Sequence, residues 1–600
     1  MNHGKYQTEW NLSPLFESDE KAQDERREIE NKLKEFVEKW RNRNDYLEKP
    51  EVLSEALSEY DEWERVYSNG GGERYYYYLR TQQDENNPEL KAKYNQINDF
   101  SIKCENEMQF FVLRLAKVPA DRQKTFLESK ELSAYHHFLE KLFAEAQYLL
   151  GEDEEKILNL KSTPAYSNWR KMTSGFLSRE TREVLTEEGT REKKSFSEIQ
   201  NMLQTSNTDV CDSAGKAINE VLVKYVDVAE AEINSILQDK KINDELRGFV
   251  RPDAARHLSD DISSTSVDAL VEAVSDHFSI SRDFYQFKAE LFGVKSLPYH
   301  WRSLVYGDIN KEYSYEDAVV LLRKVFSNLD PEFSQIFERF VDEGRIDVYP
   351  RQGKHGGAFC MGNLISQPIY VFLNYTNKAG DVSTFAHEMG HGINDELIKA
   401  KQNALNFGTP LSTAEVASTF MEDFALEELR GEADEETKLA FMVAKLDDDI
   451  ATIFRQVAAY QFEKELHNAL REKGYLSKEE IGAIFQKHMA DYMGSAVEQT
   501  SGSENWWVYW QHFRTFFYVY SYASGLLISK SLQSSVRRDH KFMQKVKVFF
   551  SAGLSDSPTN IFRGLGVDIE DKTFWEKGLL EVAALLAEAR VLAKKLGRTQ

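Results

Sequence analysis

Residues 387–391 read His-Glu-Met-Gly-His and carry the side chains best suited to metal chemistry. In a helix, residues four apart point to the same side, so His387 and His391 can both reach one ion. Glu388 is displaced by one residue step, so its carboxylate can reach a water on that ion without binding the ion itself. Zinc lowers the pKa of such a water, and a carboxylate then takes its proton. The pattern predicts a zinc-dependent hydrolase with Glu388 as general base.

A chance origin of this motif is a weak alternative. Histidine is scarce, with 13 in 600 residues, and a random chain of this composition would contain the pattern with a probability of roughly 0.03. Asp381 or Ser383 can cap a helix that begins just before the motif. Apolar residues are placed to pack its other sides: Phe385, Ala386, Met389, Ile393 and Leu397. A helix with two ordinary surface histidines is the competing interpretation.

A catalytic zinc site needs a third protein ligand and one open position. One class of zinc peptidase places a third histidine six residues after the second, but that position is Leu397. Another class takes a glutamate from the next helix, where we expect Glu415 in the first turn after a cap at Ser412 or Thr413. Glu422, two turns on, is expected to orient a ligand histidine. Small neighbours allow close helix packing: Ala414, Ala417 and Ser418. The alternative for Glu415 is a carboxylate that only interacts with the helix macrodipole.

The elements that position these residues are mostly helical. Proline is scarce, with 12 in 600 residues, and apolar residues recur at helical spacing in segments such as 25–47, 88–115 and 574–596. A boundary near residue 200 is expected because residues 186–195 are polar and charged. It would separate an N-terminal helical region, 1–200, from a catalytic region, 201–600.

One segment departs from the helical pattern. Residues 346–349, 357–361 and 368–375 are rich in β-forming residues and separated by glycines, which predicts short strands. The metal motif follows directly, so one small sheet is expected beside the active site. A strand edge at 361–366 can pair with an extended peptide, and an ordinary buried strand is the alternative.

Composition limits the partners of the protein. The net charge of −24 opposes binding to nucleic acid and to anionic membranes. Cys104, Cys211 and Cys360 are far apart, which argues against a disulfide framework. Met1–Leu12 is polar, so no signal peptide is expected, and no apolar run has the length of a membrane span. The expected location is the cytoplasm.

Several motifs together resemble the oligoendopeptidase F branch of the thimet oligopeptidase family. They are the opening at 10–16, Trp-Asn-Leu-Ser-Pro-Leu-Phe, the motif at 387–391, Ala-Glu-Val-Ala-Ser-Thr-Phe-Met-Glu-Asp at 414–423, and an aromatic run near residue 512. The resemblance implies a mainly α-helical, clam-like zinc peptidase in which two halves enclose a deep channel. It also implies His387, His391 and Glu415 as ligands, one zinc ion per chain, and short peptides as substrates.

The aromatic run from 506 to 525 is the best source of hydrogen-bond donors for the transition state. If it is helical, Tyr518 and Tyr522 share a face and Tyr520 points elsewhere. The resembled family uses a histidine and tyrosines of a similar run for oxyanion and substrate contacts. We therefore predict catalytic roles for His512, Tyr522 and Tyr518, with an aromatic core helix as the alternative.

These observations predict a zinc-dependent metalloendopeptidase that hydrolyses internal bonds of short peptides by Glu-assisted attack of a zinc-bound water. A carboxypeptidase or dipeptidase on a similar fold would need a cationic clamp for the terminal carboxylate, which the sequence does not locate. A peptide-binding protein with a degenerate site would not need Glu388. Cobalt and manganese remain alternatives to zinc because metal availability also decides occupancy. The sequence does not indicate an oligomeric state.

Overall fold

The computed structural model describes residues 6–307, 309 and 311–599, and this part of the chain is mainly helical, as the sequence predicts. Residues 1–5, part of the polar segment that argued against a signal peptide, lie outside the described residues. Among the helices described, none combines the length and the apolar character that a membrane span requires.

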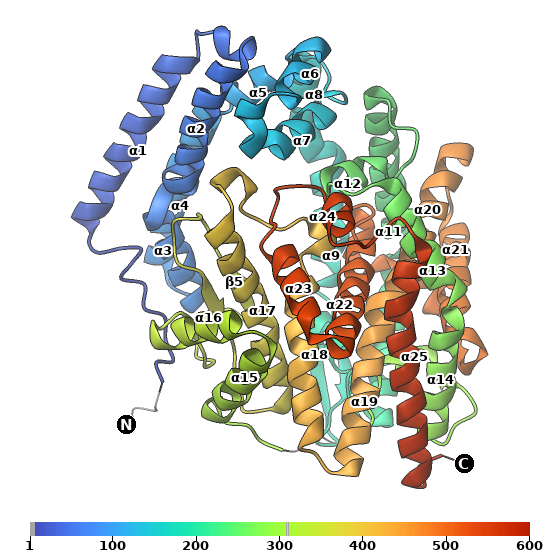
Figure 1. Ribbon diagram of the computed structural model, residues 1–600. Helices are drawn as coiled ribbons and strands as arrows, with labels where there is room; N and C mark the ends of the chain where they lie inside the picture. The colour runs from blue at the N-terminus through green and yellow to red at the C-terminus, as the bar shows by residue number, and fades with distance from the viewer. Residues whose placement is uncertain (1–5, 308, 310, 600) are drawn as a thin grey trace.

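The N-terminal helices stand beside and above the rest of the molecule (Figure 1). Helix α1 shows why these segments are amphipathic, because Ile29, Phe36 and Trp40 are buried on one side while most other residues are exposed. The helices of this part are α1 (Asp19–Trp40), α2 (Pro50–Val66), α3 (Gly71–Gln83), α4 (Pro88–Met108), α5 (Phe110–Ala116), α6 (Ala120–Leu127), α7 (His136–Ala146) and α8 (Glu152–Ser162).

The middle of the chain contains the 40-residue helix α11 (Thr208–Arg247), which ends at the left-handed Gly248. The other helices here are α9 (Asn168–Leu177), α10 (Phe196–Asn201), α12 (Ala254–Ser259), α13 (Ser264–Asp276), α14 (Phe278–Leu291), α15 (Tyr315–Leu329) and α16 (Pro331–Asp342). One apolar core runs from Leu177 to Ala593, and a separate one lies within residues 29–143. The boundary near residue 200 stays a prediction.

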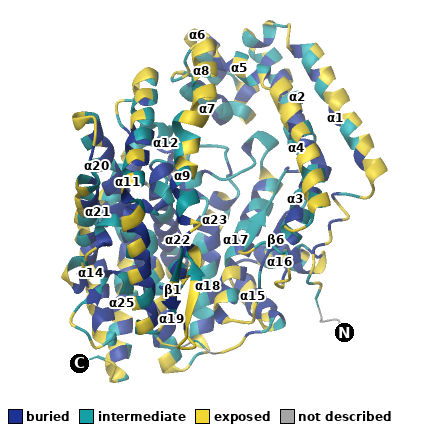
Figure 2. Ribbon diagram, turned by 180° about the vertical axis from the view of Figure 1, so that it is seen from behind, coloured by how far each residue is buried: buried dark blue, intermediate teal, exposed yellow. Residues whose placement is uncertain are grey.

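The C-terminal helices include the largely buried helix α22. Figure 2 shows α22 among buried residues, whereas exposed residues run along α1. These helices are α17 (Ala379–Lys401), α18 (Val416–Gly431), α19 (Glu435–Asp449), α20 (Arg455–Lys473), α21 (Lys478–Met493), α22 (Tyr520–Arg538), α23 (Met543–Phe550), α24 (Pro558–Gly564) and α25 (Lys572–Lys595). The metal motif lies in the middle of α17.

The three strands predicted before the motif form one sheet in the order β4-β6-β5. Strand β4 (Ile346–Asp347) is parallel to β6 (Tyr370–Phe372), and β5 (Phe359–Met361) is antiparallel to it. Strands β4 and β5 are therefore the two edge strands, with β6 between them. The edge predicted at 361–366 is wrong beyond Met361, because the chain turns there and Gln367 N donates to Leu364 O.

Two further small sheets correct the prediction of a single one. Strands β1 (Thr181–Leu185) and β2 (Arg191–Ser195) form an antiparallel hairpin, and β3 (Leu297–Pro298) pairs with β7 (Val497–Glu498). The hairpin falls in the polar segment that indicated a boundary. Its charged residues are mostly exposed, and Val184 is buried, so the strand pattern there rests on one core side chain and is weak in the sequence.

The N-terminal segment is fastened to the sheet beside the motif. Trp10, Leu12 and Leu15 pack with Tyr370 and Phe372 of β6 in a shared apolar cluster. The Trp10 indole N–H donates to the backbone carbonyl of Val371 at 2.8 Å. The opening motif of the sequence therefore supports the sheet that flanks α17.

Candidate active site

Helix α17 begins at Ala379 and carries the metal motif in its third and fourth turns. Of the two predicted capping residues, Asp381 caps the start of the helix. Its Oδ2 accepts from the backbone N–H groups of Thr376 at 2.6 Å and Lys378 at 3.0 Å. Ser383 instead points across to the next helix. The carboxylate at the helix N-terminus satisfies N–H groups that no helical carbonyl can reach.

The three predicted ligands come together around one point. Glu415 Oε2 lies 3.3 Å from His387 Nε2 and 3.4 Å from His391 Nε2. Zinc bonds of 2.0–2.1 Å in a tetrahedron give ligand atoms separated by roughly 3.3–3.4 Å. The chemistry of the set, two imidazoles and one carboxylate, and these spacings both fit zinc. The ligand roles themselves stay a prediction.

The exposure of the cluster suits a catalytic rather than a structural site. The side chains of His387, His391 and Glu415 are 27%, 25% and 41% exposed. Structural zinc sites are closed by four protein ligands, whereas catalytic sites keep one position for water or substrate. Three partly exposed candidate ligands are compatible with such an open position.

Glu422 contacts the ring nitrogen of His387 that faces away from Glu415. Its Oε2 lies 3.0 Å from His387 Nδ1, and its Oε1 accepts from Ser383 Oγ at 2.9 Å. A carboxylate next to Nδ1 keeps a proton there, which leaves the Nε2 lone pair for a metal. The orienting role predicted for Glu422 has this geometry.

Close packing of α17 on α18 brings Glu415 to the histidines. A Cβ placed on Gly390 would lie 2.6 Å from Ser418 Cα and 2.7 Å from the Ala417 carbonyl oxygen, so a larger residue cannot occupy that position. Glycine in a helix interior costs about 1 kcal/mol relative to alanine, so Gly390 inside the motif was the sequence signal for this contact. Gly525 of α22 also packs closely, with its added Cβ 3.1 Å from Glu415 Cβ.

The start of α18 differs from the prediction. A 3-10 turn, Leu411–Thr413, comes first, and Glu415 occupies the cap position before Val416. Thr413 Oγ1 donates to the Pro410 carbonyl at 3.2 Å and caps no helix. Glu415 therefore lies at the junction of two helical segments, where its side chain is not directed along the helix surface.

Glu388 lies between the ligands and strand β5. Its side chain is 8% exposed. Burial raises the pKa of Glu388, whereas the imidazoles and the backbone N–H of Cys360 lower it. A buried carboxylate next to an edge strand is well placed to act on a peptide bond held along that strand.

The charges of the cluster are strongly coupled. Burial lowers the pKa of His387, but its interactions with Glu415 and Glu422 outweigh burial and raise the pKa to about 10. Burial raises the pKa of Glu415, and the two histidines more than reverse this, so its pKa lies well below the ordinary value. The cluster therefore favours a positive charge between its carboxylates, which a metal cation also supplies.

The predicted aromatic residues form a hydrogen-bonded chain. The Trp510 indole N–H donates to His512 Nδ1 at 2.9 Å, and His512 Nε2 lies 3.1 Å from the Tyr522 hydroxyl. An indole N–H can only donate, so Nδ1 must accept and Nε2 carries the proton of the neutral ring. The ring centroids of Tyr518 and Tyr522 are 5.5 Å apart. Burial raises the pKa of both hydroxyl groups, and the negative charge of Glu415 raises it further. The structure thus brings His512, Tyr518 and Tyr522 together near Glu415.

Tyr520 lies on the other side of α22, where its hydroxyl donates to Asp260 Oδ2 at 2.8 Å. The run is not one helix, because α22 begins only at Tyr520. Phe516 and Phe517 have φ values of 53° and 54°, a left-handed conformation that costs a residue other than glycine about 1–2 kcal/mol. This turn brings Tyr518 back over His512, with ring centroids 5.8 Å apart.

Two charged side chains, the partly exposed Arg256 and the buried Glu463, hold the strained turn. Arg256 donates to the carbonyls of Thr515 at 2.8 Å and Phe516 at 3.1 Å. Glu463 Oε1 accepts from the backbone N–H of Phe517 at 2.7 Å. These residues and Trp510 support the predicted donors and were missed by sequence reasoning. Trp510 was visible in the aromatic run, but Arg256 and Glu463 had no local signal.

Tyr522→Phe is expected to lower kcat by about 10²–10³-fold, the usual effect of removing one oxyanion donor. Tyr522 joins His512 to Tyr518, so the change interrupts the chain whichever phenol donates to substrate. Steady-state kinetics on a short peptide measures the effect, together with zinc content. Tyr520→Phe is the matched control, because it removes a hydroxyl group from the same helix, but one that faces Asp260 and not the candidate site. Equal losses of kcat in both variants would contradict the role of Tyr522.

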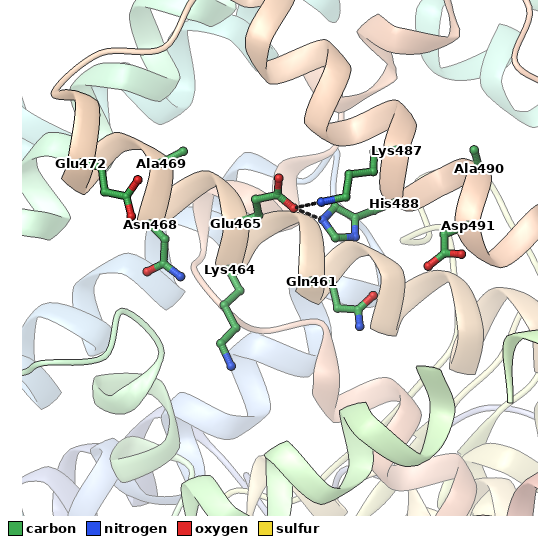
Figure 3. A pocket seen from close by; sticks show the side chains of 10 residues that line it. All are labelled: Gln461, Lys464, Glu465, Asn468, Ala469, Glu472, Lys487, His488, Ala490 and Asp491. Atoms are coloured by element: carbon green, nitrogen blue, oxygen red, sulfur yellow. Dashed lines mark hydrogen bonds and ion pairs between the residues drawn. The ribbon is translucent and has the colours of Figure 1, made fainter. Parts of the chain in front are cut away.

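A separate pocket of about 980 Å³ lies between α20 and α21 (Figure 3). Three of its side chains pair with one another: Glu465 Oε2 lies 2.7 Å from Lys487 Nζ and 2.8 Å from His488 Nε2. The pocket contains none of the residues predicted to act in catalysis.

Two families of known proteins match this chain. Residues 215–580 match peptidase family M3, and residues 114–178 match the family described as Oligopeptidase F. An oligoendopeptidase F homolog of Borreliella burgdorferi is 25% identical over 94% of this chain and 94% of its own length. Oligopeptidase PepF of Bacillus subtilis is 23% identical over 94% of this chain and 84% of its own length.

Solved structures share the fold. One from Chlamydophila abortus has a TM-score of 0.84 at 23% identity and covers 96% of this chain and 98% of its own. Oligoendopeptidase-F from Enterococcus faecium has a TM-score of 0.69 at 18% identity and covers 96% and 99%. The likeness extends over nearly the whole chain, N-terminal helices included.

Proposed function

Because the chain belongs to peptidase family M3 and is a metalloendopeptidase, we propose that it hydrolyses internal bonds of short peptides with one catalytic zinc ion held by His387, His391 and Glu415. The observation that carries the proposal is the pair of spacings around Glu415 Oε2, 3.3 and 3.4 Å, which match the edges of a zinc tetrahedron. The names of the relatives, oligoendopeptidase F and oligopeptidase, support short peptides as the substrate class.

The side chains divide the chemistry between them. Zinc at this site would lower the pKa of a water molecule and polarise the carbonyl of the bond to be cut. Glu388 takes a proton from the attacking water and passes it to the leaving nitrogen. Tyr518 and Tyr522 donate hydrogen bonds to the carbonyl oxygen as negative charge develops there, with His512 fixing the orientation of Tyr522.

Strand β5 is proposed to hold the substrate backbone. It is one of the two edge strands of the sheet, and the backbone of its Cys360 contacts Glu388. Pairing with its free edge would bind an extended peptide by main-chain hydrogen bonds and impose little side-chain preference. The Tyr75 hydroxyl of α3 donates to the carbonyl of Met361, so the N-terminal helices fix one end of this strand. We propose that they narrow access to a channel that admits peptides and excludes folded proteins.

The test is a peptide of about ten residues blocked by acetylation at one end and amidation at the other. The zinc-loaded enzyme is expected to cut it internally, since no free terminus is needed, and mass spectrometry identifies the fragments. Folded ubiquitin in the same reaction should stay intact, and its unfolded fragments should be cut. Release of terminal residues only from an unblocked version of the peptide, with no cut in the blocked one, would refute endopeptidase action.

A further inference from the structure

A second group of ligating side chains lies where the N-terminal helices meet the catalytic part of the chain. His137 and Glu140 come from α7, Asp261 follows α12, and Asp556 precedes α24. Figure 1 shows α7 above α12 and α24, and the contacts between α7 and α12 agree with this view. His137 is only 8% exposed, although Glu140 and Asp556 are about half exposed.

The distances resemble those of the candidate zinc site. His137 Nδ1 lies 3.2 Å from Glu140 Oε2 and 3.9 Å from Asp556 Oδ1, and the three ligand atoms all lie within 4.8 Å of one another. The separation between His137 and Glu140 is close to the edge length of a tetrahedral zinc site, and the separations from Asp556 are longer. A small divalent ion could therefore bind between the three atoms once the Asp556 carboxylate moved closer.

A carboxylate contacts the second ring nitrogen of His137, as Glu422 contacts Nδ1 of His387. His137 Nε2 lies 2.5 Å from Asp261 Oδ2, just as His387 Nδ1 lies 3.0 Å from Glu422 Oε2. A carboxylate behind a histidine, with oxygen ligands in front, is the usual arrangement of a metal-binding imidazole. Asp556 Oδ1 is oriented in turn by the side-chain amide of Asn560 at 2.9 Å.

The charge of the group is unbalanced without a cation. Within the described residues, the ion-pair partners of Glu140, Asp261 and Asp556 are His136 and His137 only. Three carboxylates thus face two imidazoles, and an excess of negative charge remains even when both rings are protonated. His136 Nδ1 is also 3.3 Å from Glu140 Oε2, so a second imidazole is within reach of the same space.

We propose that His137, Glu140 and Asp556 bind a second zinc ion, with Asp261 orienting His137 and His136 available as a further ligand. Imidazole and carboxylate together suit zinc, whereas calcium and magnesium prefer oxygen ligands alone. The site joins α7 to the segment before α24, so this ion would tie the N-terminal helices to the catalytic part and take no part in the reaction.

The test counts zinc ions per chain. Wild-type protein and variants are dialysed to equilibrium against one zinc buffer that saturates the wild type, and zinc and protein are then measured. Wild type is expected to hold two ions per chain, and Glu140→Gln/Asp556→Asn is expected to hold one and keep its peptidase activity. Glu145→Gln is the matched control, because Glu145 lies on the same helix near Asp261 but outside the ligand set; it should keep two ions.

The converse variant separates this site from the catalytic one. His391→Asn should lose the catalytic ion and still bind one zinc, and added zinc should raise its Tm. Adding Glu140→Gln/Asp556→Asn to His391→Asn should abolish both effects. One zinc ion per wild-type chain would overturn the proposal, since His137 and its carboxylates would then form an ion-pair network only. Retention of two ions by Glu140→Gln/Asp556→Asn, or occupancy by calcium in place of zinc, would overturn it as well.

Discussion

Glu388→Gln is expected to retain zinc, bind peptide and lose about 10²–10⁴-fold in kcat, the contribution of a positioned general base. Glutamine keeps the shape of the side chain and its hydrogen bond from the backbone of Cys360, but it cannot accept a proton. Glu388 is 8% exposed, so solvent does not easily replace it as a base. Because the same carboxylate serves both the attacking water and the leaving nitrogen, we expect the upper part of that range.

The measurement is kcat alongside zinc content and peptide affinity. Glu396→Gln is a suitable control, because Glu396 lies two turns further along α17 and pairs with Arg339 at 3.1 Å and Arg345 at 2.8 Å, outside the candidate site. Its loss affects stability and should leave kcat unchanged. A fall of less than about tenfold in Glu388→Gln, with zinc retained, would show that another group is the base.

The parts of the site that could be predicted are those that depend on local spacing. His387 and His391 are one helical turn apart, so helix geometry alone brings them to the same side. The approach of Glu415 depends on packing between two helices, but the sequence carries its signature in Gly390, Ala417 and Ser418. Where small residues mark a close contact, a long-range neighbour can be inferred from the chain itself.

The turn before α22 shows where such inference ends. Phe516 and Phe517 are poor candidates for left-handed backbone, and the sequence favours a continuous helix through them. Their conformation is held by Arg256 and Glu463, which lie 260 and 54 residues away in the chain. Tertiary hydrogen bonds overcome the local backbone preference here, and no residue near the turn indicates the left-handed conformation. The cluster at His137 is similar, because its orienting Asp261 is 124 residues away.

The fold, like the site, has parts that the sequence predicts and parts that it does not. Helices such as α25 were predicted because an apolar face repeats along 24 residues. The β1–β2 hairpin was not predicted because its strands bury only Val184 and leave no alternating apolar face to detect. The sheet beside α17 lies between these cases: its strands are short, but the glycines between them and their β-forming residues mark them.

Glu415→Ala is expected to weaken zinc binding at the catalytic site by about 10²–10³-fold. Zinc held by four protein ligands is bound with roughly 10–16 kcal/mol, or about 2.5–4 kcal/mol for each ligand, and each 1.4 kcal/mol is a factor of about ten. The loss also frees the two imidazoles from the carboxylate that lies 3.3 and 3.4 Å from them. Glu422→Ala should have a smaller effect, about 10–100-fold, because it only orients His387.

Two readouts distinguish these variants. The first is the zinc concentration that restores half of the peptidase activity after treatment with a chelator, and the second is kcat at saturating zinc. Glu428→Ala is the control on the same helix, since Glu428 pairs with Lys324 at the surface and should change neither. The zinc concentration needed for half of the activity should be far higher for Glu415→Ala than for Glu422→Ala, and higher for Glu422→Ala than for the control. If Glu415→Ala keeps normal zinc affinity and turnover, the third ligand lies elsewhere, and the spacing around Oε2 reflects an ordinary ion pair between Glu415 and the two histidines.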